Sequence, residues 1–238
     1  MISSEKMMIS KLFVFRHAET FDNHLGIFSG WRDSELTSEG LMQAYKIGEQ
    51  LKRYQIDYAF TSHLKRAQKT LEIVLQAHPD VPVFVDDRLI ERCYGLLQGK
   101  SKRKLEEADP EWYAQFHRGY GSAPPKGESL RMVEKRVISF LQQLEKWLEK
   151  APGNVAISCH NNSIRPIRMV FENLSLKQML QLETPQDCAM TYELQLHNLS
   201  GGRLVGESNM QNWESLLVSS QVKLSTDPLN PLKKYYDL

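Results

Sequence analysis

Short apolar runs of strand length recur along the chain and are separated by longer segments. They lie at residues 11–15, 57–61, 81–85, 154–159 and 192–196. Most are rich in β-branched or aromatic residues, a composition typical of strands that are buried in a sheet. The pattern therefore predicts five strands.

Several of the segments between these runs carry apolar residues at helical spacing, and each opens on Ser or Thr, a common helix start. The predicted helices begin at Thr37, Ser62, Ser129 and Ser163. The third of them is the longest and ends before Pro152 and Gly153. Residues 20–36 are predicted to form a loop, and residues 98–125 a partly helical insertion that covers another part of the molecule.

Strands that alternate with helices predict an α/β fold with a mostly parallel central sheet and helices on both faces. We expect a single domain over residues 1–238, in which residues 98–127 form a lid insertion and residues 219–238 a mobile tail. In such sheets, ligands bind beyond the carboxyl ends of the strands. The polar residues that follow the strands are therefore the first candidates for a site.

The composition limits the classes of partner and the compartment. The 238 residues carry a net charge of +1, which gives no reason to expect a nucleic acid or an anionic membrane as partner. Cys93, Cys159 and Cys188 have no C-x-x-C spacing and are odd in number, so we expect reduced thiols. We find no apolar core of a secretory signal and no run of the ~18 apolar residues that a membrane span needs. We therefore expect a cytoplasmic protein.

Two of the predicted strands end beside a histidine. His17 follows Arg16 after the first strand, and His160 follows the fourth. Such a histidine can accept a phosphoryl group, act as a base, bind a metal ion or simply occupy a turn. Two neighbouring ones, with an arginine fork suited to phosphate oxygens, favour a pocket for a dianion. No carboxylate lies at metal-ligand spacing to either histidine, which disfavours a metal site.

Two further residues, Arg66 and Glu91, would have a function in such an anion-binding pocket. Arg66 falls in the first turn of a predicted helix, where the helix dipole disfavours a cation unless it faces an anion. A solvated surface arginine is the alternative. Glu91 is a carboxylate that can exchange a proton with a hydroxyl during phosphoryl transfer, although alone it would be an ordinary loop acid.

At these residues the chain resembles the histidine phosphatase superfamily, and within it the cofactor-dependent phosphoglycerate mutases. RHAET at 16–20 is similar to the superfamily signature RHG-E-S/T. The segments that resemble the mutases, in family order, are FSGWRDSELTSEG at 28–40, TSHLKRAQKT at 61–70, ERCYGLLQGKSK at 91–102, FHRGYGSAPPKGESL at 116–130, SCHNNSIRPI at 158–167 and TPQDCAMTYEL at 184–194. The similarity covers most of the chain and implies a phosphoglycerate mutase-like fold.

The resemblance also implies roles for the matching residues. His17 would carry the phosphoryl group, and Glu91 would donate and accept the proton. The groups that hold the phosphoryl group would be Arg16, Arg66 and His160. The substrate-binding residues would be Asn23, Ser29, Gly30, Tyr94, Lys102, His117, Arg118, Asn161 and Asn162.

The implied activity is the interconversion of 3-phosphoglycerate and 2-phosphoglycerate, a reaction of glycolysis and gluconeogenesis. The resemblance implies 2,3-bisphosphoglycerate as the priming cofactor and no metal ion. The expected partner is therefore a phosphorylated small molecule, without nucleic acid or membrane, and the sequence leaves a homo-oligomer open.

Several residues depart from the family pattern. Ala18, Asp22, Cys93, His117 and Asn161 stand where the mutases have other residues. Asn161 replaces a glycine beside the phosphate, and His117 replaces an arginine of the lid, which removes a permanent charge. If His117 contacts the ligand, we expect phosphate release relative to mutase turnover to rise from about pH 6 to pH 8, around the usual histidine pKa.

These departures keep two alternatives in view. The first is a phosphatase of the same fold that acts on a sugar phosphate or another small phosphomonoester, since fewer lid cations favour water as the acceptor. The second is a non-catalytic module that binds a phosphorylated ligand. Turnover of any phosphomonoester would exclude that second alternative.

Overall fold

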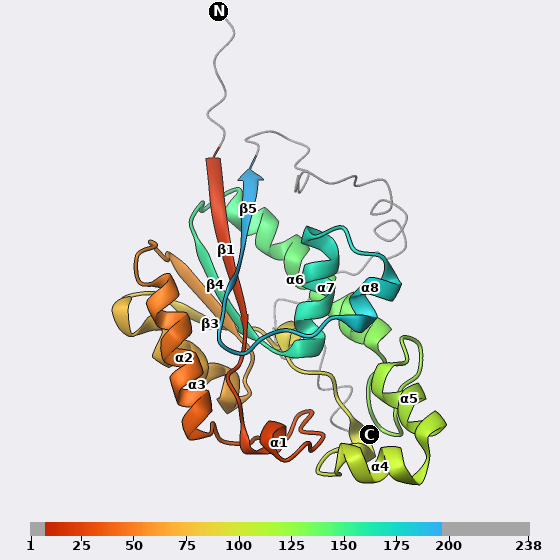
Figure 1. Cartoon of the computed structure of the whole chain (residues 1–238). Coiled ribbons are helices and arrows are strands. Elements are labelled where there is room, and N and C mark those ends of the chain that lie inside the picture. Colours follow the sequence, from red (N-terminus) through yellow and green to blue (C-terminus); the bar gives the residue numbers. More distant parts are fainter. Residues whose placement is uncertain (1–7, 197–238) are drawn as a thin grey trace, which may run out of the picture.

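A five-stranded sheet forms the centre of the molecule in the computed structural model, which describes residues 8–196 (Figure 1). The strands are β1 Met8–Arg16, β2 Tyr58–Thr61, β3 Val83–Val85, β4 Val155–Cys159 and β5 Met190–Leu196, and they lie in the order β3-β2-β4-β1-β5. Neighbouring strands pair in parallel, except that β5 pairs antiparallel with β1. The prediction of a mostly parallel sheet is confirmed, whereas the tail predicted over 219–238 lies outside the described residues.

Helices cover both faces of this sheet, as predicted. The longer ones are α2 Ser38–Leu51, α3 Lys65–Val74, α6 Leu130–Leu148 and α7 Asn161–Phe171. The pair α2 and α3 packs on one face, and the pair α6 and α7 packs on the other (Figure 1). None of the helices within residues 8–196 is both long enough and apolar enough to cross a membrane.

The apolar run of β1 serves two separate cores because successive side chains of a strand point to opposite faces. Leu12 and Val14 are fully buried in the cluster under α6 and α7. Phe13 and Phe15 are fully buried in the cluster under α2 and α3. A continuous apolar run is therefore what a strand covered on both sides requires.

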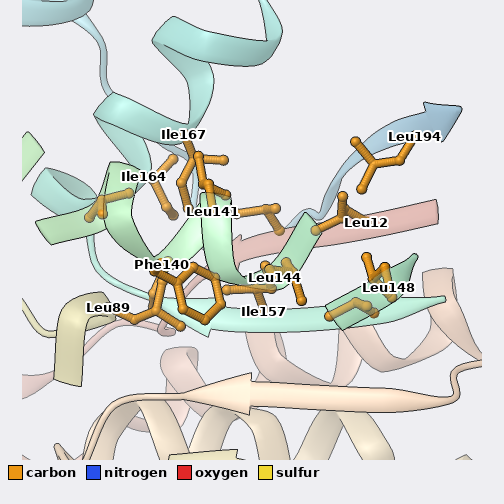
Figure 2. Packing of buried hydrophobic residues seen from close by; sticks show 14 of the residues in the cluster. Leu12, Leu89, Phe140, Leu141, Leu144, Leu148, Ile157, Ile164, Ile167 and Leu194 are labelled. Atoms are coloured by element: carbon orange, nitrogen blue, oxygen red, sulfur yellow. The ribbon is translucent and has the colours of Figure 1, made fainter. Parts of the chain in front are cut away.

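Figure 2 shows the larger of the two cores. Leu141 and Leu144 of α6 and Ile164 of α7 pack over Leu12 of β1 and Ile157 of β4. All five side chains are at most 4% exposed. This packing holds α7 rigidly at the carboxyl end of β4.

Two of the longer helices start where they are predicted to, and the other two start elsewhere. Thr37 and Ser129 cap α2 and α6, because each side chain accepts the backbone N–H three residues on. The helix predicted from Ser163 is α7, which starts two residues earlier, at Asn161. The helix predicted from Ser62 is α3, which starts at Lys65 instead of directly after Ser62. The Ser62 hydroxyl does not cap it, since this group forms a 2.7 Å hydrogen bond with Nε2 of His160. Ser62, which the sequence pattern suggests as a helix cap, therefore positions the strand-end histidine His160 instead.

Shorter helices escape the sequence pattern because four to nine residues contain too few turns to show a period. They are α1 Phe21–His24, α4 Lys102–Ala108, α5 Pro110–Arg118 and α8 Leu176–Gln181, with 3-10 turns η1 Leu75–Ala77, η2 Asp87–Leu89 and η3 Gly95–Leu97. The helix α1 lies inside the predicted loop, α4 and α5 form the predicted insertion, and α8 is not predicted. In Figure 1, α1, α4 and α5 lie beyond the carboxyl end of β1.

The buried guanidinium of Arg92 ties the insertion to the segment that precedes it. It donates to the carbonyl oxygens of Glu128 at 2.7 Å, Ser122 at 3.0 Å and His117 at 3.1 Å. These three acceptors lie at the end of α5 and on the chain that returns to α6. Arg92 therefore ties the end of the insertion to the segment that carries Glu91.

The larger core predicts the effect of one substitution. Leu141→Ala should lower the free energy of unfolding by about 2–5 kcal/mol, because it leaves a cavity among side chains that are themselves held by the sheet. Chemical denaturation followed by circular dichroism measures this change. Leu41→Ala on α2 is the matched control, since Leu41 is 39% exposed and should cost less than about 1 kcal/mol. Equal losses in the two variants would contradict the packing described above.

Candidate active site

A cavity of about 270 Å³ opens at the carboxyl ends of β1 and β4. Sequence-predicted site residues that line it are Arg16, His17, Asn23, Ser29, Gly30, Arg66, Glu91, Tyr94, Lys102, His117, Arg118, Asn161 and Asn162. His160 lies against His17, with 5.1 Å between the ring centroids. The structure thus brings every predicted residue together. Four further lining residues escaped the sequence reasoning, namely Ile27, Phe28, Arg165 and Glu183.

The imidazole of His17 is held in one tautomer by two hydrogen bonds. Nδ1 lies 2.8 Å from the carbonyl oxygen of Ala18, which only accepts, so Nδ1 carries the proton. Nε2 accepts a hydrogen bond from Nε of Arg66 at 3.2 Å. Burial, together with the nearby charges of Arg66 and Arg16, holds the pKa of His17 well below its usual value. The ring therefore presents an unprotonated Nε2, which is the form needed for a nucleophile.

Arg66 is a buried cation with fixed partners, so the alternative of a solvated surface arginine is wrong. Its side chain is 2% exposed. Nη2 donates to the carbonyl oxygen of Gly30 and Nη1 to that of Arg32, both at 2.7 Å. These bonds shape the loop before α2 and leave the plane of the guanidinium beside His17. A phosphoryl group on His17 would meet this charge directly.

His160 stands behind His17 and keeps one ring nitrogen without a partner. Its Nε2 lies 2.7 Å from Oγ of Ser62. Its Nδ1 is buried and forms no hydrogen bond with any residue in the described part of the chain. Burial, followed by the charge of Arg66, lowers the pKa of His160 well below the usual histidine value. When Ser62 donates to Nε2, the proton resides on Nδ1, which can then donate to an oxygen of a bound phosphate.

The guanidinium of Arg16 is buried, and one of its N–H donors has no hydrogen-bond acceptor among the described residues. Its Nη1 donates to the carbonyl oxygen of Thr184 at 3.4 Å, whereas Nε is buried and lacks an acceptor among residues 8–196. Burial lowers the pKa of the Arg16 guanidinium, although the carboxylates of Glu91 and Glu183 oppose that shift. An unpaired buried donor costs free energy until an acceptor arrives. An anion in the cavity would supply that acceptor.

One oxygen of the Glu91 carboxylate is fixed and the other is available. Oε1 accepts hydrogen bonds from the backbone N–H of Arg92 at 2.7 Å and from Nδ2 of Asn162 at 2.9 Å. Nδ2 of Asn162 also bonds the hydroxyl of Tyr94 at 3.0 Å. No residue between 8 and 196 forms a hydrogen bond with Oε2. Glu91 is thus oriented by Oε1 and can exchange a proton through Oε2.

The outer part of the cavity gathers cations from the insertion and from α7. Nζ of Lys102 lies 5.5 Å from the centre of the Phe28 ring, and burial, followed by the charge of Arg16, lowers the pKa of Lys102. Arg165 donates to Oδ1 of Asn162 at 2.9 Å and to the carbonyl oxygen of Leu182 at 2.9 Å. These cations lie beyond the pair of histidines, where a second anionic group of a ligand would reach.

Glu183 is the least expected residue of the cavity. Its carboxylate accepts a 2.5 Å hydrogen bond from Arg118 and a 3.2 Å bond from Nδ2 of Asn161, and it lies 3.7 Å from Arg165. Asn161, which replaces a glycine in the family pattern, therefore directs its amide to Glu183. Oδ1 of the same side chain accepts the backbone N–H of Thr184 at 3.2 Å. The larger side chain is accommodated by this loop.

His117 lines the cavity but is enclosed by aromatic rings. The centroid of its ring lies 4.8 Å from that of Tyr113 and 5.6 Å from that of Phe28. Burial, followed by the charges of Arg118 and Lys102, lowers the pKa of His117 to about 4. In the free protein near neutral pH this residue is therefore uncharged, which differs from the partly charged histidine that its usual pKa predicts.

The charged side chains of the cavity are mostly permanent cations. Within residues 8–196 no group of three or more His, Cys, Asp or Glu side chains is arranged to hold a metal ion. The positive charge of the cavity comes instead from Arg16, Arg66, Lys102, Arg118 and Arg165. Such an arrangement suits the binding and transfer of a phosphoryl group by permanent cations.

Comparisons with known proteins agree with this geometry. The phosphoglycerate mutase of Schizosaccharomyces pombe is 36% identical over 191 residues, which cover 77% of this chain and 89% of that protein. The 2,3-bisphosphoglycerate-dependent phosphoglycerate mutase of a Chlamydia trachomatis strain of serovar L2 is 34% identical over 209 residues, with 76% and 92% covered. The crystal structure of the α-ribazole phosphatase from Shigella flexneri shares the fold, with a TM-score of 0.69 and 24% identity over 84% of this chain and 100% of that one.

The family itself is shown by a match over most of the chain. Residues 12–201 match the model of the histidine phosphatase superfamily, branch 1. The matched region contains both strand-end histidines and all the cations of the cavity. With His17, Arg16, Arg66, Glu91 and His160 assembled at the carboxyl ends of β1 and β4, the chain belongs to branch 1 of the histidine phosphatase superfamily.

Proposed function

We propose that this protein is a phosphoglycerate mutase that interconverts 3-phosphoglycerate and 2-phosphoglycerate through a phosphohistidine on His17. The observation that carries the proposal is the unprotonated Nε2 of His17, held by Arg66 in a cavity that also contains Glu91. The names of relatives at about 35% identity support the choice of substrate. The cofactor would be 2,3-bisphosphoglycerate, which primes the enzyme.

The first step of the proposed mechanism transfers a phosphoryl group from 2,3-bisphosphoglycerate to the enzyme. Nε2 of His17 forms the new N–P bond while the ester O–P bond breaks. Glu91 in its protonated form gives a proton to the departing oxygen, and a monophosphoglycerate leaves. Arg16, Arg66 and His160 offset the charge that spreads over the transferring oxygens.

The second step reverses the first on a different hydroxyl. Glu91 accepts the proton of the free hydroxyl of 3-phosphoglycerate, whose oxygen attacks the phosphorus and breaks the N–P bond. The bisphosphoglycerate then turns within the cavity, and its other phosphoryl group returns to His17. Glu91 is thus a base in one half-reaction and an acid in the other, in accordance with microscopic reversibility.

The outer cations would hold the groups that do not react. Lys102, Arg118 and Arg165 lie where they can meet the carboxylate and the second phosphate. The insertion over residues 98–127 contributes the first two and would act as a lid that keeps water from the phosphohistidine. The expected partner is a phosphorylated small molecule, and a cytoplasmic location remains an expectation from the sequence.

A phosphatase is the second candidate, and two observations favour it. His117 adds no charge to the lid near neutral pH, and Arg118 is already paired with Glu183. Both features weaken the hold on a bisphosphorylated intermediate and so favour water as the acceptor. The shared fold with an α-ribazole phosphatase is compatible with this reading. An assay that follows 2-phosphoglycerate and free phosphate together, with and without 2,3-bisphosphoglycerate, distinguishes the two.

The phosphoenzyme is the first testable consequence. Incubation with 2,3-bisphosphoglycerate labelled on phosphorus should leave acid-labile, base-stable label on the wild-type protein, because a phosphoramidate bond hydrolyses in acid. His17→Ala should abolish the label, whereas the control His24→Ala on α1, whose side chain is 67% exposed, should retain it. Since no metal is expected, the buffers contain EDTA. Label that persists in His17→Ala, or activity that returns only with added zinc or manganese, would refute the mechanism.

Glu91→Gln tests the proton transfer. The amide keeps the shape and hydrogen bonding of the side chain but removes the base, so phosphoryl transfer should slow by about 10²–10⁴-fold. Single-turnover transfer from the phosphoenzyme to 3-phosphoglycerate measures the rate, and KM should change little. Glu72→Gln, an exposed acid on α3 paired with Lys69, should behave as wild type. A near wild-type rate in Glu91→Gln would mean that the proton takes another route.

The burial of His117 moves its expected pH effect to lower pH. The free protein has a pKa of about 4 at this residue, and a bound dianion raises it because the charged form is then stabilised. Affinity for the bisphosphate is therefore greatest below the free pKa, falls between the free and the bound pKa, and is constant above the bound pKa. We predict that phosphate release relative to mutase turnover rises from about pH 4 upward and is flat above about pH 7.

His117→Arg should remove this dependence, since guanidinium keeps its charge throughout the range. The variant should also release less phosphate for each mutase turnover. The ratio is measured by the same dual assay at each pH. A flat ratio in the wild-type protein over the whole range would indicate that His117 does not meet the ligand and that Lys102 and Arg118 act alone.

A further inference from the structure

Three helical elements meet at the carboxylate of Glu183. Arg118 is the last residue of α5, Asn161 is the first residue of α7, and Glu183 follows α8. The carboxylate accepts hydrogen bonds from Arg118 at 2.5 Å and from Asn161 at 3.2 Å. Arg118 also donates to the carbonyl oxygen of Leu180 at 3.2 Å, within α8. The lid helix is thus joined to the body of the protein at an anion.

The charge of Glu183 acts on much of the cavity. It lies 3.7 Å from the guanidinium of Arg165. It also opposes the fall in pKa that burial causes at Arg16, Lys102 and Arg165. Conversely, burial would raise the pKa of Glu183, but Arg118, Arg165 and Arg16 together hold that pKa below its ordinary value. Glu183 is therefore a permanent anion placed among the cations that a ligand needs.

The charge balance of the cavity is consistent with this role. Five cationic side chains and the two carboxylates of Glu91 and Glu183 line it, and the neutral histidines add nothing, which leaves +3. A monophosphoglycerate carries about −3 from one carboxylate and one phosphate, and a bisphosphoglycerate about −5. The cavity with Glu183 in place thus matches the singly phosphorylated ligand better than the doubly phosphorylated one.

The carboxylate can also leave its position at low cost. The side chain of Glu183 is 60% exposed and that of Arg118 39% exposed. An ion pair between two such exposed side chains is weak, so an incoming phosphate or carboxylate can replace the pair of Glu183 with Arg118. The side chain of Arg165 is only 3% exposed, and it keeps its bonds to Asn162 and to the carbonyl oxygen of Leu182 when Glu183 leaves. Water would solvate the displaced side chain. An anionic group of a ligand can therefore replace the carboxylate of Glu183 as the partner of Arg118.

We propose that Glu183 is an internal counter-anion that the second anionic group of the ligand displaces from Arg118 and Arg165, and that it determines how firmly a bisphosphorylated ligand is held. This inference rests on the proposed function for the identity of the ligand. Glu183 is here a specificity-determining residue, which weakens retention of the bisphosphate relative to ligands that occupy the inner site alone. It also keeps Arg118 in place on the lid helix while no ligand is bound.

Equilibrium binding tests the proposal without any turnover. Isothermal titration calorimetry measures the affinity for 2,3-bisphosphoglycerate and for inorganic phosphate, in proteins that all carry His17→Ala so that no phosphoryl transfer occurs. Glu183→Gln should tighten the binding of bisphosphoglycerate by about 5-fold, the upper range for an exposed ion pair. Binding of inorganic phosphate, which reaches only the inner site, should change by less than about 2-fold.

Two further variants separate charge from shape. Glu183→Asp keeps the charge and should bind bisphosphoglycerate with the affinity of the parent. Glu107→Gln removes an exposed carboxylate of α4 that is paired with Arg103 outside the cavity, and it should leave both affinities unchanged. Thermal unfolding of each variant establishes that it is folded. Unchanged or weaker binding of bisphosphoglycerate by Glu183→Gln would overturn the proposal.

A double-mutant cycle with Arg118 identifies the partner. In an Arg118→Gln background, Glu183→Gln should tighten bisphosphoglycerate binding less than in the parent, because the released guanidinium is absent. Equal effects in both backgrounds would refute the displacement from Arg118. The outcome is independent of the mutase proposal, since a protein without mutase turnover can still show the difference in affinity. Conversely, a mutase with unchanged affinities would disprove only the role of Glu183.

Discussion

The parallel pairing of β1 with β4 is the constraint on which the site depends. In this register Arg16 lies opposite Cys159, so the next residue of each strand, His17 and His160, emerges at the same edge of the sheet. Both strands are buried on both faces. A shift of the register by one residue would turn each side chain of the shifted strand toward the other core, where it does not fit. The hydrophobic cores therefore determine the separation of the two imidazoles, although they contain no group of the site.

The concentration of positive charge in the cavity has a cost that the fold offsets with backbone carbonyls. Buried guanidinium groups lose hydration, and each must find acceptors nearby. Arg66 finds the carbonyl oxygens of Gly30 and Arg32, which satisfy its donors without cancelling its charge. The inner cation consequently remains able to attract an anion. In the outer part of the cavity, by contrast, the carboxylate of Glu183 partly offsets the charges of Arg118 and Arg165.

The sequence was most informative where a residue type is tied to a strand end or a helix start. The strands, the positions of His17 and His160, and the long helix after Ser129 follow from local patterns that tertiary contacts reinforce. Ser62 was misjudged as a helix start because a serine hydroxyl serves a cap and a distant histidine equally well. Glu183 gave no signal, since an acid in a loop acquires its role from Arg118, 65 residues away in the chain. The state of His117 depended on aromatic neighbours that only the folded chain assembles.

The anchoring of the insertion by Arg92 has a consequence for how the enzyme moves. The guanidinium holds the carbonyl oxygens of His117, Ser122 and Glu128, and its own backbone N–H is bound to the carboxylate of Glu91. The end of α5 and the carboxylate are therefore parts of one mechanical unit. A movement of the insertion that kept these bonds would carry the segment of Glu91 with it, so the alignment of Glu91 with His17 depends on this anchor.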